Sequence, residues 1–117
     1  MTVLELARTI VEECWADEAG LDRMESLVAA GYVHHSAFGD VPFAGFREGI
    51  AWVDGVFAER SYRVEHIVAE GDLAAVYLTW SATRRADGSA VSGRGAYHLR
   101  VTGGRVAEDW DVFFPMS

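Results

Sequence analysis

The sequence predicts a single α+β domain in which N-terminal helices cover one face of an antiparallel sheet. In the first half of the 117-residue chain apolar residues recur at helical spacing, whereas after Arg60 they alternate with polar residues as in strands. Glycine-containing turn sequences divide the second half at 70–72, 86–89 and 103–104. Half of the residues are hydrophobic, so residues 1–117 can bury one core and leave little room for a second domain.

Three helices are predicted before Arg60. The first is capped by Thr2 and ends at Gly20, and the second covers about 21–30 and stops at a glycine. The third covers about 45–59, with an apolar stripe at helical spacing. The segment between the second and third helices, up to residue 43, is predicted to be a loop with an unusual number of aromatic residues.

Four strands are predicted to follow as a meander of three hairpins, covering about 62–69, 73–83, 90–101 and 105–114. In the third strand Gly93, Gly95, Tyr97 and Leu99 share one face, which we expect to be the covered one. Glycine weakens a strand unless something approaches closely or the sheet bends there. We therefore expect a sharply bent sheet with a concave pocket.

Composition excludes several function classes. The net charge is −8 and all ten basic residues are Arg, which disfavours nucleic acid as a partner and excludes Schiff-base chemistry by Lys. Cys14 is the single cysteine and lies in an apolar helical stripe, so we expect a core residue in a reducing cytoplasm. No basic segment leads into an apolar run and no stretch approaches membrane-spanning length, so we expect a soluble, unexported protein that does not bind membranes.

Asp109 and Asp111 lie two residues apart on the last strand and therefore on one face. If that face lines a closed cavity, their repulsion raises one pKa and the pair can work as acid and base; if it faces water, both are solubilising charges. Val106, Trp110 and Val112 form the more apolar opposite side. Both sides could be buried if a second subunit covers this one, which predicts a homodimer through the sheet with Trp110 at the interface.

The histidines and remaining polar residues give weaker signals. His34 and His35 are adjacent, so in an extended segment their rings point opposite ways and at most one serves a given site. The histidines and acids show no metal-ligand spacing, so we expect no metal. No glycine-rich phosphate loop lies between a strand and a helix, and no serine has a nucleophile-elbow context.

Aromatic residues are open to two interpretations. They can form plain core, or they can line an apolar cavity for a hydrophobic small molecule. Tyr97 is likewise either a phenol pointing into such a cavity or a buried structural tyrosine. The candidate lining residues are Trp15, Phe38, Trp52, Phe57 and Trp80.

The order of segments resembles the SnoaL-like polyketide cyclases of the nuclear transport factor 2-like superfamily. The features that carry it are the paired N-terminal helices, residues 32–35 (Tyr-Val-His-His), Gly45 before the third helix, the hairpin at 70–72, and the segment 103–111. The resemblance covers nearly the whole chain. It implies a bent sheet that forms, with the helices, a cone around a pocket.

In these cyclases an Asp on the last strand acts as general acid/base for an intramolecular aldol closure, without metal or cofactor, and the matching position is Asp111. His34 falls where they carry a polar residue near the pocket, whereas Gly95 and Tyr97 replace a Gln and a His. The resemblance thus implies catalysis by Asp111. We expect His34 and Tyr97 to assist it, and we expect Asp109 to modulate this base and to be one of the ligand-binding residues. A non-catalytic binding protein and an isomerase or dehydratase remain alternatives on the same fold.

Overall fold

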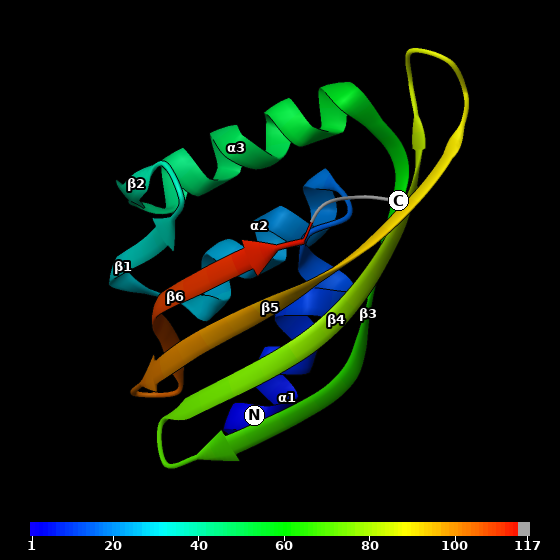
Figure 1. Cartoon of the computed structure of the whole chain (residues 1–117). Helices are drawn as coiled ribbons and strands as arrows, with labels where there is room; N and C mark the ends of the chain where they lie inside the picture. The colour runs from blue at the N-terminus through cyan, green and yellow to red at the C-terminus, as the bar shows by residue number, and fades with distance from the viewer. Residues whose placement is uncertain (115–117) are drawn as a thin grey trace.

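A computed structural model describes residues 1–114 and shows helices packed against one strongly curved sheet (Figure 1). The helical elements are α1 (Val3–Thr9), the π-helical segment η1 (Ile10–Cys14), α2 (Glu18–Leu27) and α3 (Phe43–Val56). The strands are β1 (Val28–Ser36), β2 (Gly39–Val41), β3 (Phe57–Glu70), β4 (Leu73–Arg84), β5 (Ala90–Thr102) and β6 (Arg105–Phe113). The predicted α+β fold class is confirmed.

The sheet has six strands within residues 1–114, in the order β2-β1-β6-β5-β4-β3. The predicted meander is confirmed in β3 to β6, whose neighbours pair antiparallel. β1 extends it by pairing parallel with β6, so the sheet is mixed and not wholly antiparallel. In Figure 1 the long strands β3, β4 and β5 curve around the N-terminal helices. α3 covers another part of the same concave face and runs from the end of β2 to the start of β3.

The segment predicted as the end of a helix and a loop is instead the strand pair β1 and β2. α2 ends at Leu27, and β1 begins at once with Val28. β1 is held by partners remote in sequence, with Val33 opposite Glu108 on β6. Local pattern could not find it, because non-local pairing overrides local strand and turn preferences.

The first predicted helix also ends earlier than expected. The break lies at residues 15–17, and Asp17 caps α2 by accepting a hydrogen bond from the Gly20 amide at 2.7 Å. Gly20 therefore lies inside α2 and does not end a helix. A Cβ there would lie 2.5 Å from the carbonyl oxygen of Glu13, so this glycine serves the close approach of α2 to η1.

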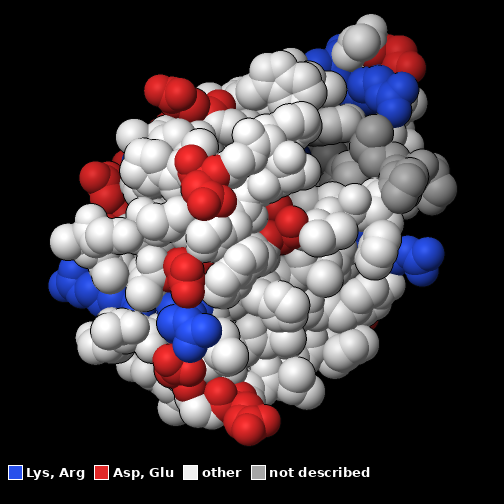
Figure 2. Space-filling view, turned by 60° about the vertical axis from the view of Figure 1, so that its left-hand side comes forward, with Lys and Arg blue, Asp and Glu red and all other residues white. Residues whose placement is uncertain are grey.

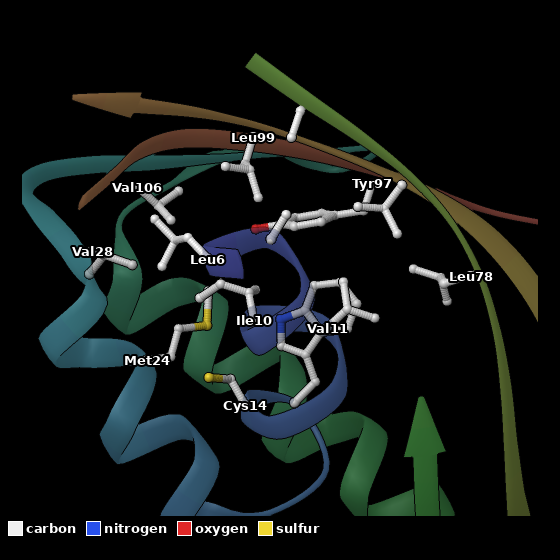
Figure 3. Packing of buried hydrophobic residues seen from close by; sticks show 14 of the residues in the cluster. Leu6, Ile10, Val11, Cys14, Met24, Val28, Leu78, Tyr97, Leu99 and Val106 are labelled. Carbon is white, nitrogen blue, oxygen red and sulfur yellow. The ribbon is translucent and has the colours of Figure 1, made fainter. Parts of the chain in front are cut away.

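The hydrophobic core fills the space between α1, η1, α2 and the concave face of the sheet (Figure 3). Cys14 is fully buried there, as predicted. The core side chains labelled in Figure 3 are Leu6, Ile10, Val11, Cys14, Met24, Val28, Leu78, Tyr97, Leu99 and Val106.

A β-bulge at Ala107 changes which residues of β6 face inward. Val101 pairs with Val106 and Arg100 with Glu108, so Ala107 has no partner on β5. Val106 and Asp109, three residues apart, are consequently both fully buried. The prediction that Val106 lies on the opposite side from Asp109 is wrong, because simple alternation holds only on one side of the bulge.

The two glycines of β5 make room for aromatic rings, so close approach, the alternative to a bend at these positions, is what the structure shows there. A Cβ on Gly93 would lie 2.6 Å from Trp80 Nε1, and a Cβ on Gly95 would lie 2.8 Å from Phe113 Cδ1. Trp80 on β4 and Phe113 on β6 are the paired neighbours of these glycines. Both rings therefore lean over β5 from either side.

β3 contains a second bulge near its start. Ala58 pairs with Thr83 and Ser61 with Ser81, so Glu59 and Arg60 together oppose one residue of β4. Glu59 has a φ of 54°, the left-handed region that costs a residue with a Cβ about 1–2 kcal/mol. Arg60 lies in this bulge on the inward side of β3, where it is buried.

Charged side chains are dispersed over the surface. Figure 2 shows acidic side chains scattered over one face, with wide uncharged areas between them and few basic groups. Through residue 114, no helix has both the length and the apolar character needed to cross a membrane.

We predict that the strained backbone at Glu59 can be separated from its side chain. Glu59→Gly should leave the free energy of unfolding unchanged or higher, because glycine adopts this φ without steric cost. Glu59→Val should lower it by about 1–2 kcal/mol. Chemical denaturation measures both changes. Ser61→Val, at an exposed position of the same strand, is the control; equal midpoints for Glu59→Val and wild type would contradict the left-handed conformation.

Candidate active site

Strands remote in sequence bring the candidate catalytic residues together. β1 and β6 pair so that His34 lies opposite Asp109, and β5 pairs with β6 so that Tyr97 lies opposite Asp111. Residues opposite each other on neighbouring strands share a face of the sheet. All four side chains therefore point to the concave, helix-covered face.

Asp109 is the fully buried centre of this cluster. Its carboxylate accepts hydrogen bonds from Tyr32 Oη at 2.8 and 2.9 Å, from Tyr97 Oη at 2.7 Å and from His34 Nδ1 at 2.7 Å. A buried carboxylate is costly unless it is hydrogen-bonded, and here three donors from β1 and β5 satisfy it.

The hydrogen bond to Asp109 orients His34. Because Nδ1 donates to Asp109, the other ring nitrogen, Nε2, is directed toward Asp111, whose Oδ2 lies 3.4 Å away. Burial by itself would lower the pKa of His34, but the hydrogen bond and charge of Asp109, together with the charge of Asp111, outweigh it and raise that pKa above 6.5. His34 is thus held as a proton donor.

Asp111 is the carboxylate that faces the cavity, with a side chain that is 20% exposed. Partial burial raises its pKa above 3.8, Asp109 raises it further, and the nearby His34 opposes the rise. A carboxylate with a raised pKa is a stronger base than an ordinary surface Asp.

The two tyrosines hold Asp109 and lie outside the cavity lining. The Tyr97 ring is fully buried in the core (Figure 3). The ring of Trp15 meets it edge to face, with ring centroids 4.8 Å apart. Burial, and then the charge of Asp109, raise the pKa of both Tyr97 and Tyr32 far above 10, so the phenols remain protonated donors. Tyr97, predicted to assist catalysis, donates to Asp109 and is not among the residues that line the cavity.

A largely apolar cavity of about 440 Å³ opens in front of His34 and Asp111. Its size falls within the usual range for small-molecule sites. The cavity lies between the sheet and α3, and its mouth includes Phe38 and Phe113. The lining residues used below are Trp15, His34, Arg60, Tyr62, Trp80 and Asp111.

Four of the five aromatic residues predicted to bind the ligand line this cavity. They are Trp15, Phe38, Phe57 and Trp80. Trp52 is not among the lining residues: it lies on the outer side of α3 and is 71% exposed, so its predicted place in the site is wrong. Its helical spacing beside the apolar stripe did not fix the direction of its side chain.

His35 points away from the cavity, as expected for the neighbour of His34 in a strand. Its ring contacts Asp40 through Nδ1 at 2.8 Å and Glu108 through Nε2 at 2.9 Å, and it stacks on Trp110. Among the described residues, no group of three or more His, Cys, Asp or Glu side chains could hold a metal ion.

Two residues of the site were not predicted from sequence. Tyr32 was placed in a loop, and its bond to Asp109 depends on the parallel pairing of β1 with β6. Arg60 lines the cavity, although its position marked only the change from helical to strand spacing. The one available signal was that Arg60 lies where helical spacing changes to strand spacing. Strands are irregular at such places, and bulges are common beside active sites.

Comparison with solved structures finds the same fold. A proposed hydroxylase, AclR from Streptomyces galilaeus, is 24% identical with a TM-score of 0.82, over 96% of this chain and 88% of that one. The proposed polyketide cyclase IdmH from Streptomyces antibioticus is 18% identical with a TM-score of 0.85, over 97% and 92%. A proposed SnoaL-like polyketide cyclase from Jannaschia sp. CCS1 is 16% identical with a TM-score of 0.85, over 95% and 84%.

No curated protein sequence matches the chain. A family model, however, matches residues 7–109, which include most of the helices and sheet together with His34 and Asp109. The model is that of the SnoaL-like domain, in agreement with the resemblance found in the sequence and with the structural neighbours. This chain belongs to the SnoaL-like domain family.

Proposed function

We propose that this protein is an acid/base enzyme that closes a ring in an apolar carbonyl compound, as the polyketide cyclases of its family do. The observation that carries the proposal is the row formed by Asp109, His34 and Asp111. Asp109 Oδ1 accepts a hydrogen bond from His34 Nδ1 at 2.7 Å. Asp111 Oδ2 lies 3.4 Å from the other ring nitrogen, Nε2, at the cavity wall. This row combines a fixed proton donor with a carboxylate base.

Asp111 is the proposed base. In the first step its carboxylate removes a proton from a carbon next to a carbonyl group, and the C–H bonding electrons move into the enolate. The raised pKa of Asp111 brings it closer to that of the carbon acid and so favours the transfer.

His34 is the proposed acid. Its raised pKa favours the imidazolium, whose Nε2–H can hydrogen-bond to the oxygen on which negative charge develops. The fixed Nδ1 bond to Asp109 means that this donor does not have to reorient during the reaction. Asp109 is thus a positioning residue that acts through His34.

Ring closure then needs only proton return. The enolate carbon attacks a second carbonyl carbon of the same molecule, a C–C bond forms, and the second carbonyl oxygen becomes an alkoxide. The proton taken up by Asp111 passes to this alkoxide, so no proton or electron is gained or lost overall. The apolar wall favours a folded substrate and excludes water from the enolate.

The first prediction concerns Asp111→Asn, which keeps the shape of the side chain and removes the base. With 2-naphthylacetone as probe in D₂O, the wild type should accelerate exchange of the protons next to the carbonyl, and the variant should lose about 10²–10⁴-fold of this rate. NMR measures the exchange. Asp22→Asn, on the exposed side of α2, is the matched control and should keep the rate.

Thermal unfolding and ligand binding complete this experiment. Asp111→Asn should fold with a stability close to that of the wild type, because the side chain is only partly buried and has no short hydrogen bond. Exchange at the wild-type rate in a folded Asp111→Asn would contradict the mechanism. Binding of the probe without any exchange in the wild type would favour a non-catalytic binding protein.

The second prediction concerns pH. Exchange should follow a bell-shaped profile, because Asp111 must be deprotonated and His34 protonated. As the pH is lowered, the rate should fall when Asp111 takes up a proton, and the pKa of this limb lies above 3.8. As the pH is raised, the rate should fall when His34 loses its proton, and the pKa of that limb lies above 6.5.

Asp109→Asn should move the alkaline limb to lower pH, because burial then lowers the pKa of His34 without the opposing charge. NMR titration of the His34 ring checks this independently of turnover. Tyr97→Phe removes one donor to Asp109 and keeps its charge, so it is the milder companion if Asp109→Asn fails to fold. An unchanged His34 pKa in a folded Asp109→Asn would contradict the role given to Asp109.

The third prediction concerns assembly. We propose a homodimer through the outer face of the sheet, which carries Trp110 together with Val112, 61% exposed, and Phe114, 41% exposed. Val112→Arg should convert a dimer into a monomer with little change in the unfolding of the domain. Sedimentation velocity at micromolar concentration measures this, and a monomeric wild type would contradict the proposal.

A further inference from the structure

Arg60 places a positive charge in the wall of the cavity. Its side chain is 3% exposed and belongs to the lining. The guanidinium donates hydrogen bonds to the carbonyl oxygens of Trp15 at 2.7 Å and Ala16 at 3.2 Å, and to Tyr62 Oη at 3.1 Å. All three acceptors are uncharged.

The charge of Arg60 has no buried counter-ion among residues 1–114. The carboxylate within reach is that of Asp54, whose Oδ1 lies 3.5 Å from the guanidinium, and this side chain is 58% exposed. Asp54 lies equally close, at 3.5 Å, to the exposed Arg85. Buried charges are normally paired, and a solvated carboxylate shared by two guanidinium groups compensates Arg60 weakly.

Three hydrogen-bond donors of the cavity lining have no acceptor. In the described part of the chain Arg60 Nε, Trp15 Nε1 and Trp80 Nε1 are buried without an acceptor, and all three residues line the cavity. Leaving a buried donor without an acceptor is energetically costly. A carboxylate has two oxygens that together accept several hydrogen bonds, so it suits a cation whose cavity also holds unpaired N–H donors.

The backbone places Arg60 at a cost. The bulge in β3 contains Arg60 and the preceding Glu59, whose φ is 54°, and the Arg60 side chain faces the cavity. Strain of this kind persists where the surrounding structure maintains it, and it gathers at ligand sites. This observation is independent of the unpaired donors and points to the same residue.

We infer that the cavity binds an apolar acid whose carboxylate is held by Arg60, with the N–H groups of Trp15 and Trp80 as further donors. The inference rests on the proposed function and names its substrate class. Trp80 on β4 lies opposite Gly93 of β5, and Asp111 on β6 lies opposite Tyr97, four residues further along β5. Strand spacing therefore puts the backbones of Trp80 and Asp111 roughly 16 Å apart. The cavity of about 440 Å³ that both residues line is in the size range of small-molecule sites.

The two ends fix one orientation of the ligand. Asp111 repels a carboxylate, and Arg60 attracts it, so the acid group is held at one end and the reacting carbon at the other. The donors are covered in the structure, so binding requires a side-chain movement at the wall. Trp80 and Phe57 are only partly buried and meet edge to face at 5.7 Å, and their rings are the ones that can turn aside.

The test compares three naphthalene probes of similar size by equilibrium dialysis. They are 2-naphthoate, the neutral ketone 2-acetylnaphthalene and 2-ethylnaphthalene, which has no acceptor. The wild type should bind 2-naphthoate about tenfold more tightly than either neutral probe. Equal affinities, or a preference for the ketone, would overturn the inference.

Variants assign the preference to the site. Arg60→Met should remove it, and Arg85→Met, the matched control that also contacts Asp54, should keep it. Since Arg60 also holds the backbone at Trp15 and Ala16, Trp80→Phe is the second variant; it keeps a ring in place, removes one N–H and should reduce the preference several-fold. Full preference in a folded Trp80→Phe and a folded Arg60→Met would overturn the inference.

Asp111→Asn distinguishes this inference from the proposed function. It should abolish exchange on 2-naphthylacetone and retain, or strengthen, binding of 2-naphthoate, since it removes a repelling charge. Selective binding of 2-naphthoate without any exchange would leave the carboxylate site standing and refute the catalytic proposal. Exchange without a preference for 2-naphthoate would leave the catalytic proposal standing and refute the carboxylate site.

Discussion

The hydrogen bonds to the Asp109 carboxylate join β1, β5 and β6 at one point inside the protein. Tyr32 and His34 approach it from β1 and Tyr97 from β5, all within 2.9 Å. Removing the carboxylate would leave buried donors unpaired on two strands, so the parallel pairing of β1 and the orientation of His34 depend on the same group. Because Nδ1 of His34 is committed to Asp109, Nε2 is the nitrogen presented at the cavity. Structural support and acid/base geometry are therefore one arrangement.

Local sequence patterns predict the parts of this fold that rest on local physics. The switch from helical to alternating spacing identifies the division into helices and meander, and the glycine turns locate the hairpins of β3 to β6. They fail for β1, whose partner on β6 lies about 75 residues away, as the separation of His34 from Asp109 illustrates. They also fail at Gly20, where glycine serves a close helix contact and resembles a helix end. Pairing energy and close packing between distant segments leave no local pattern.

The candidate site divides in the same way. The family resemblance selected His34 and Asp111, and both lie at the cavity wall. Alternation along β6 suggested that the acids face solvent, because Val106 was counted on the opposite side. The bulge at Ala107 reverses that count. On β3, Arg60 itself belongs to a bulge. In both strands a charged residue of the cavity thus lies in or after a bulge, where period-two alternation is interrupted. A residue-by-residue reading of alternation misses polar groups at the places where active sites put them.

Charge is distributed unevenly inside this cavity, and the unevenness bears on how a ligand would lie. On the β1–β6 side two carboxylates flank one imidazole, so that side carries net negative charge even when His34 is protonated. On the β3 side a guanidinium is surrounded by neutral carbonyl and hydroxyl acceptors. Between them the wall is apolar, and weak screening there lets both ends act on one bound molecule. A neutral ligand would gain little from this separation of charge, whereas a molecule with an acid group at one end and an activated C–H bond at the other would be aligned by it.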